Sequence, residues 1–312
     1  MQGRPQYTCQ IHHGHGRKMS DFVQQNGIGT EFTSSESWVI LSPIELSIKR
    51  KIEAVGVPLK DWDINIYRGV LTGYNDAFII STDKRDEILA NCQSEEERAR
   101  TEELIRPILR GRDIKRYGYD WAGLWLINTH NGIKGILERI HIEDYPAVKA
   151  HLDQYWDKIS TRADKGDTPY NLRNCAYLDD FNKPKIVYPN MTKYLPFFYD
   201  DEKFFTNQKC FIITGEYTAF LTAFFNSSLF KYCFKDNFPE LLGGTRELSK
   251  IFFDKIPVIQ IDKGIDAIFR GLVTEIQLKP SKDLAIEIDR KIFGLYGLTE
   301  EERQEIGFIE IQ

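Results

Sequence analysis

The chain has 312 residues, of which 42% are hydrophobic and 13% aromatic, a composition that is typical of a folded globular protein and excludes a disordered one. Its formal net charge of −5 excludes a uniformly basic protein. From Asp283 onward, however, eight acids oppose three bases, so the rest of the chain is balanced at 38 acids and 38 bases. A neutral body with local basic clusters can still bind nucleic acid.

Cysteine spacing and hydropathy exclude two further classes of protein. The five cysteines are scattered and form no C-x-x-C pair, so we expect reduced thiols and no zinc site. No run approaches the roughly 18 apolar residues that a membrane-spanning helix needs. No signal peptide is evident either. We therefore expect a cytoplasmic protein with no membrane contact.

The first twenty residues fit neither a helix nor a strand, and residues 1–35 are predicted to be a leader, either disordered or an artificial extension. The leader contains a histidine-rich motif, HHGHGR, whose histidines are His12, His13 and His15. Clustered histidines can bind metal, but no acid or thiol lies nearby at ligand spacing. We therefore favour a leader over a metal site.

The next segments carry clear secondary-structure signals. A strand is expected at Trp38–Leu41, followed by a helix with Ser42 as N-cap, Pro43 at N1, a capping box and an end at Gly56. The turn residues 72–76 lie between two predicted strands and suggest a hairpin-like turn. A second capping box at Ser94 begins a charged helix that leads to a basic segment.

The basic segment LIRPILRGRDIKRYGYDWAGLWLIN, residues 104–128, combines clustered cations with aromatic residues and a short apolar strand. Pro107 and Gly111 interrupt any long helix, so most cations should lie on a loop and a turn. Such a cluster suits a phosphate backbone, although a solvated charged loop is the alternative. Its cations fall within residues 106–116, where Asp113 alone opposes them, and are Arg106, Arg110, Arg112, Lys115 and Arg116.

After residue 128, the spacing of apolar residues predicts helices in some segments and strands in others. A long loop at 161–173 and a glycine loop at 243–246 interrupt this pattern, and loops of this kind are often functional. Helices are expected at 145–159, 217–234, 265–278 and 284–295, and strands near 186–188, 197–199, 203–205 and 210–214.

LRGRDIKRY, followed by a tryptophan and an apolar strand, resembles the TaqI-like C-terminal specificity domain. That domain belongs to adenine-specific DNA methyltransferases and to single-chain type IIG restriction-modification enzymes. The resemblance runs from about Trp38 to the C-terminus. Six further segments agree with it in the expected order: RGVLTGYNDAFII (68–80), TRADKGDTPYNLR (161–173), PKIVYPN (184–190), FFTNQKCFIIT (204–214), LTAFFNSSLFKYCF (221–234) and GGTRELSKIFFDKIPV (243–258).

The resemblance implies a mixed α/β target-recognition domain at 36–260, with twisted mixed sheets and peripheral helices. A helical segment at 261–312 would pack on it as a spacer or dimer element. The implied partners are double-stranded DNA and a methyltransferase domain, with or without a nuclease domain. S-adenosylmethionine would bind that methyltransferase domain, and no cofactor is expected in this chain.

Two sets of DNA-binding residues are predicted, because phosphate contacts position a protein and base contacts specify the site. Long cations on loops are assigned to phosphates: Arg110, Arg112, Lys115, Arg116, Arg162, Lys165 and Arg173. Amides and cations on connections are the candidates for reading adenine or guanine edges, with turn-forming Asn as the duller alternative for the amide. These are Asn207, Gln208, Lys209 and Arg246.

We expect no catalytic residue. The chain has no Asn-Pro dipeptide, so it lacks the Asn-Pro-Pro-aromatic element of adenine methyltransferases. Asp180, Asp201 and Lys203 mimic the spacing of a metal-dependent nuclease, which makes a nuclease the first alternative function. A scaffold that binds proteins through the helical C-terminus is the second.

Overall fold

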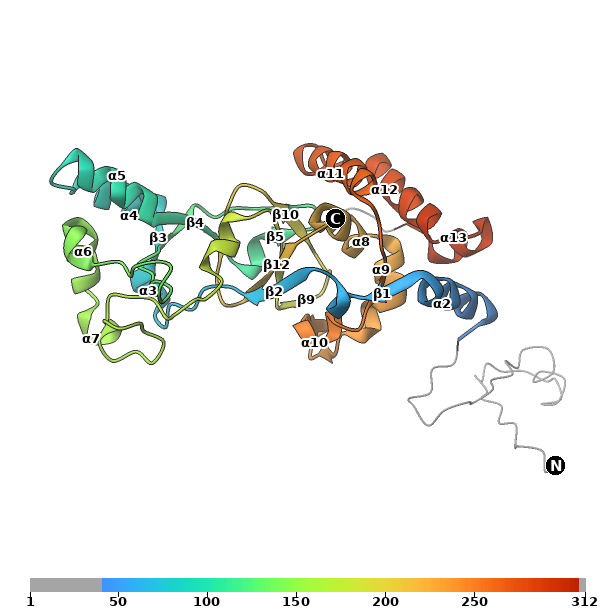
Figure 1. The fold of residues 1–312 in the computed structure, drawn as a ribbon, viewed down its shortest axis with the longest axis horizontal. Helices are drawn as coiled ribbons and strands as arrows, with labels where there is room; N and C mark the ends of the chain where they lie inside the picture. The colour runs from blue at the N-terminus through green and yellow to red at the C-terminus, as the bar shows by residue number, and fades with distance from the viewer. Residues whose placement is uncertain (1–40, 309–312) are drawn as a thin grey trace, which may run out of the picture.

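The computed structural model describes residues 41–308 and shows an elongated protein of mixed α/β architecture, as predicted (Figure 1). The predicted leader with its histidines, and the predicted strand at Trp38–Leu41 apart from its last residue, lie outside the described residues. Within residues 41–308, no helix is long and apolar enough to cross a membrane.

An antiparallel sheet in the order β10-β8-β12-β2 lies in the middle of the molecule and separates two hydrophobic cores (Figure 1). Successive side chains of a strand point to opposite faces. Ile186 and Tyr188 therefore enter one core, and Val187 between them enters the other. The strands of this central sheet are β2 (Ile64–Arg68), β8 (Lys185–Pro189), β10 (Phe198–Asp200) and β12 (Cys210–Gly215).

The first core is rich in phenylalanine and is covered by helices from both ends of the described chain, on the right of Figure 1. The strands β1 (Gly56–Pro58) and β15 (Pro257–Ile259) pair beneath these helices. The helices are α2 (Pro43–Val55), α8 (Thr218–Phe225), α9 (Ser228–Phe234), α11 (Lys263–Leu278), α12 (Lys282–Leu295) and α13 (Glu300–Ile306).

The second core surrounds a mixed sheet in the order β11-β4-β7-β3, in which only β11 and β4 are parallel. The strands are β3 (Ile79–Ser81), β4 (Ile105–Leu109), β7 (Leu124–Ile127) and β11 (Phe205–Thr206). The helices around it, on the left of Figure 1, are α3 (Asn75–Phe78), α4 (Thr82–Ala90), α5 (Glu95–Leu104), α6 (Pro146–Asp153) and α7 (Trp156–Ile159).

Smaller elements gather near the centre of the molecule. The pair β5 (Ile114–Lys115) and β6 (Gly118–Tyr119) follows a 3₁₀ turn, η2 (Gly111–Asp113). A three-stranded antiparallel sheet comprises β13, β14 and β9 in that order. Its strands, and the short helix after them, are β9 (Met191–Thr192), β13 (Glu240–Leu241), β14 (Thr245–Glu247) and α10 (Lys250–Phe253).

The first predicted helix is confirmed down to its cap. Ser42 Oγ accepts a hydrogen bond from the Glu45 amide at 3.3 Å, and the Glu45 carboxylate accepts one from the Ser42 amide at 2.6 Å. Ser94 also caps α5 as predicted. The second capping box is not completed, because the Glu97 carboxylate accepts from the amides of Gln93 and Ala147 and so joins α5 to α6.

Three sequence predictions of local structure are corrected. The segment 68–80 is no hairpin, because β2 and β3 belong to different sheets and the chain passes from one core to the other. The predicted helix 145–159 is divided into α6 and α7 at residues 154–155. The supposed loop at 243–246 runs into β14, whose pairing with β9 could not be read from its sequence.

The predicted helix 217–234 is likewise two helices. Ser227 caps the second one, and the Asn226 side chain bonds both the amide and the carbonyl of Phe197. A polar side chain that satisfies a neighbouring strand therefore interrupts a segment whose apolar pattern predicts a continuous helix.

The central sheet buries an ion pair completely. Lys185 Nζ lies 2.5 Å from Asp200 Oδ2 and donates to the Phe181 carbonyl at 2.7 Å. The same carboxylate accepts from the amides of Glu202 and Phe204. Neither side chain of the pair has solvent exposure, so removal of one partner leaves a buried charge without compensation.

We predict that Lys185→Met lowers the free energy of unfolding by about 3–5 kcal/mol, because Asp200 remains buried. Lys183→Met is the matched control: Lys183 is 59% exposed and pairs with Asp180, so the loss should stay below about 1 kcal/mol. Urea unfolding of the two variants measures the difference. Equal effects would show that the buried pair contributes no more than a surface pair.

Candidate nucleic-acid interface

A cleft of about 1390 Å³ opens where the central sheet ends, beside η2, β9 and α9. We call it the basic cleft. Among the described residues that line it there are eight basic side chains and no acidic one. The basic residues come from separate segments of the chain and are Arg110, Arg112, Lys115, Arg116, Lys193, Lys209, Lys231 and Lys235.

The turn η2 brings the first of these cations against the sheet. A Cβ placed on Gly111 would lie 3.3 Å from both the Lys209 carbonyl oxygen and Pro189 Cβ, so the turn packs closely on the ends of β12 and β8. Asp113 is buried and accepts hydrogen bonds from the Arg110 amide and guanidinium at 2.8–3.0 Å. Arg110 therefore shapes the turn, and Arg112 remains exposed.

Arg116 anchors the following strand pair to the helices. Its guanidinium donates to the Asn226 carbonyl at 2.8 and 3.0 Å and lies 5.4 Å from the ring centre of the buried Tyr117. Lys115 is exposed, with Asp120 at 3.3 Å. The predicted loop and turn are thus present. Of the cations that they carry, Arg110 and Arg116 hold the local structure, and Arg112 and Lys115 are exposed.

Three cations of the basic cleft escaped the sequence prediction. Lys193 follows β9, while Lys231 and Lys235 lie one helical turn apart in α9 and just after it. Partial burial lowers the pKa of Lys231, and the positive charges of Lys235 and Arg116 lower it further. The i, i+4 spacing in FKYCFK was a signal, but sequence alone does not show that these lysines approach Arg116.

The candidate base readers have different environments. Lys209 is exposed in the basic cleft, whereas Gln208 is half-buried, does not line the cleft and has its Oε1 buried. Asn207 is only 8% exposed, and its side chain accepts from the Lys209 amide and the Cys210 thiol. Its Oδ1 closes the turn between β11 and β12, as the duller alternative expected, but Asn207 also lines the basic cleft, and a base contact by this side chain stays a prediction.

The prediction that Arg246 reads a base conflicts with its burial. It is 6% exposed, donates to the carbonyls of Lys235 and Phe238, and forms ion pairs with Asp236 and Glu240 at 2.9 and 3.0 Å. A guanidinium carries five donors in a fixed plane, so it can join several carbonyls and acids that a lysine could not. Arg246 braces the β13–β14 hairpin and is not free to reach DNA.

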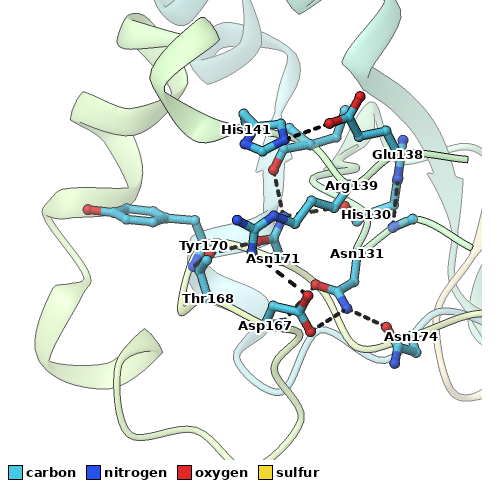
Figure 2. Close-up of polar contacts among 12 residues, drawn as sticks. His130, Asn131, Glu138, Arg139, His141, Asp167, Thr168, Tyr170, Asn171 and Asn174 are labelled. Atoms are coloured by element: carbon cyan, nitrogen blue, oxygen red, sulfur yellow. Dashed lines mark hydrogen bonds and ion pairs between the residues drawn. The ribbon is translucent and has the colours of Figure 1, made fainter. Parts of the chain in front are cut away.

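The loop at 161–173 lies away from the basic cleft, against the segment that follows β7 (Figure 2). Asn131 accepts from the Asp167 amide and donates to Asp167 and Asn174, and Arg139 lies 3.8 Å from Asp167. Asn171 donates to the carbonyls of His130 and Ile140. These contacts join two polar loops into one surface.

Within this loop only two of the three predicted phosphate contacts are accessible. Arg162 is 7% exposed and donates to the carbonyls of Thr72, Asp164, Pro169 and Asn171, so its prediction is corrected. Burial lowers its pKa to about 10. The two others are exposed, and their phosphate contacts stay predictions: Lys165 and Arg173.

The alternative nuclease centre is not assembled. Asp180 contacts Lys183 and Thr214, while Asp201 and Lys203 are exposed. Across residues 41–308, no group of three or more histidine, cysteine or acidic residues is placed to hold a metal ion. The spacing that suggested a nuclease therefore reflects separate surface and turn positions.

Comparison with solved structures shows which proteins share this fold. The type IIG restriction endonuclease BpuSI matches with a TM-score of 0.54 and 16% identity, over 85% of this chain and 32% of its own. The type IIL restriction-modification enzyme MmeI, solved in complex with DNA, matches with a TM-score of 0.54 and 13% identity, over 80% of this chain and 36% of its own. The fold is thus shared with restriction-modification enzymes, and this chain spans about a third of their length.

A family model matches part of the sequence. Residues 106–258, just under half of the chain, match the model of the TaqI-like C-terminal specificity domain. The resemblance noted in the sequence is confirmed over these residues. The matched region begins in β4 and ends in β15, so it includes the elements that bring the cations of the basic cleft together.

We predict that Arg162→Ala lowers the free energy of unfolding by about 3 kcal/mol or more, since several buried carbonyls lose their donor. Arg173→Ala, in the same loop but 58% exposed and paired with Asp164, should change it by no more than about 0.5 kcal/mol. Thermal or urea unfolding compares the two. If both variants unfold alike, the burial of Arg162 does not stabilise the loop.

Proposed function

We propose that this chain recognises double-stranded DNA as the specificity domain of a restriction-modification enzyme. The observation that carries the proposal is the basic cleft, in which eight cations converge without a single acid among the described lining residues. A solvated charged surface normally mixes both signs, and the body of this chain is balanced in charge overall. A cation-only cleft on a neutral body suits a polyanion.

The division of labour within the cleft follows from accessibility. Arg112, Lys115 and Lys231 are exposed and are assigned to phosphates. Arg110 and Arg116 contribute charge while they hold the turn and the strand pair. Lys209 remains the best candidate for a guanine edge, because it is exposed in the cleft. Gln208 lies next to it on the same connection and is the weaker candidate, for an adenine edge, because its Oε1 is buried.

The finer proposal concerns the catalytic partner. We propose that adenine-N6 methyl transfer is carried out by a methyltransferase domain that works with this one in the cytoplasm, with or without an endonuclease. S-adenosylmethionine would bind in that domain. The motifs shared with adenine-specific methyltransferases support this proposal, as does the absence of an Asn-Pro dipeptide here.

Loss of one phosphate contact should weaken binding to all duplexes alike. We predict that Arg112→Ala and Lys231→Ala each lower affinity and reduce the magnitude of the slope of log K against log salt by about 0.9. The measurement is fluorescence anisotropy with mixed-sequence duplexes over a salt series. Lys263→Ala is the matched control, since this exposed lysine begins α11 outside the basic cleft.

Wild-type affinity and salt slope in both cleft variants would contradict this assignment. The duplex would then have to be sought on the surface formed by the two polar loops of Figure 2, where Lys165 and Arg173 are exposed.

We predict that the chain alone transfers no methyl group, because it lacks the Asn-Pro-Pro-aromatic element. Incubation with labelled S-adenosylmethionine and mixed-sequence duplex should give background incorporation. Specific labelling of adenine that a point mutation in this chain abolishes would overturn the prediction.

A further inference from the structure

The tip of the β13–β14 hairpin presents a leucine entirely to solvent. Leu242 is 100% exposed. The two glycines after it have φ angles of +80° and +76°, which residues with a side chain adopt only with strain. Gly244 N–H donates to the Leu241 carbonyl, and Thr245 Oγ1 donates to the Leu242 carbonyl. No atom lies within 4 Å of a Cβ built on either glycine, so the tip projects away from the body.

Strand register places this tip beside the basic cleft. Arg246 of β14 pairs with Thr192 of β9, in antiparallel register. The chain that leaves β9 through Lys193 and Tyr194 therefore runs alongside β14 toward the hairpin tip. Both of these residues line the basic cleft, and Tyr194 is 67% exposed.

The surface around the tip is apolar, and the acids nearest to it form ion pairs with an arginine. Met191 is 51% exposed and Leu241 is 37% exposed on the same small sheet. Two of the three acids of this region, Asp236 and Glu240, are paired with Arg246, and the third, Glu247, lies at the end of β14 that is farther from the tip. The apolar tip is therefore next to a cation-rich cleft and is not surrounded by free acids.

Bracing makes the hairpin a fixed element. Arg246 joins it to the carbonyls of Lys235 and Phe238 at the end of α9. The Leu248 amide donates to the Asn190 carbonyl at 2.8 Å and fastens the other end of β14 to the connection after β8. An exposed leucine on a braced turn meets the requirement for insertion, since a loose tip would fold back on binding.

We propose that Leu242 is a wedge that enters the duplex between two base pairs and partly unstacks them, while the basic cleft holds the phosphates. Apolar side chains used in this way kink the duplex and increase the protein surface in contact with it. This inference rests on the proposed function, because only a duplex gripped by the cleft brings a base step to the tip. Charge complementarity favours DNA over a protein partner for this surface.

The experiment compares the 312-residue chain and its Leu242→Ala variant on a short mixed-sequence duplex and on the same duplex with one central mismatch. A mismatch already meets part of the unstacking cost, so the wild type should bind the mismatched duplex about tenfold more tightly. Leu242→Ala should lose most of that preference and keep the salt slope on the intact duplex. Permanganate oxidation of unstacked thymines in the bound intact duplex should also be lower with Leu242→Ala than with the wild type.

Leu278→Ala is the matched control, because this leucine is 82% exposed at the end of α11 and does not line the basic cleft. It should behave as the wild type. If the wild type and Leu242→Ala prefer the mismatched duplex equally, the wedge proposal is wrong. Salt-dependent binding of the intact duplex would in that case still support the proposed function. Failure to bind any duplex would overturn both and assign the tip to a protein contact.

Discussion

Burial of both faces of the central sheet is the constraint on which the rest of the structure depends. In β8, Ile186 and Tyr188 enter the helical core and Val187 enters the other, so a shift by one residue would exchange the two sets. No face of this strand is left for solvent, and even its polar residue, Lys185, is buried against Asp200. Function is therefore confined to the ends of the strands, and the basic cleft lies at one such end.

The described cations are used in two ways. Several arginines are internal supports, because a planar guanidinium can bond several carbonyls at once: Arg116 holds the Asn226 carbonyl in the basic cleft, and Arg162 and Arg246, which do not line the cleft, are nearly inaccessible. Exposed cations of the cleft, such as Arg112, Lys115 and Lys209, keep their charge in solvent. Such cations around a fixed frame suit the phosphate contacts proposed above, which carry no sequence information.

The negative net charge is reconciled with this role by where the acids are used. Glu302 in the last described helix accepts hydrogen bonds from Ser47, Lys51 and the Thr299 amide, and these donors lower its pKa to about 2. Asp289 accepts from Ser228, at the start of α9. These acids hold helices to one another beneath the cleft, and none of the described cleft-lining residues is an acid. Net charge is a poor guide here because it does not show that eight basic side chains line one cleft without a described acid among them.

The sequence by itself determined the resemblance to the TaqI-like specificity domain, the mixed architecture, the capped helix at Pro43–Val55 and the turn that carries Arg110 and Arg112, because these depend on short-range pattern and capping chemistry. Only the tertiary structure decided which cations face solvent. Arg162 and Arg112 are equally basic in the sequence, but one meets four carbonyls and the other none of them. Lys193 and Lys231 join the site only because β9 and α9 lie beside the turn in space. Burial and convergence are set by contacts between segments far apart in the chain, and local periodicity does not encode them.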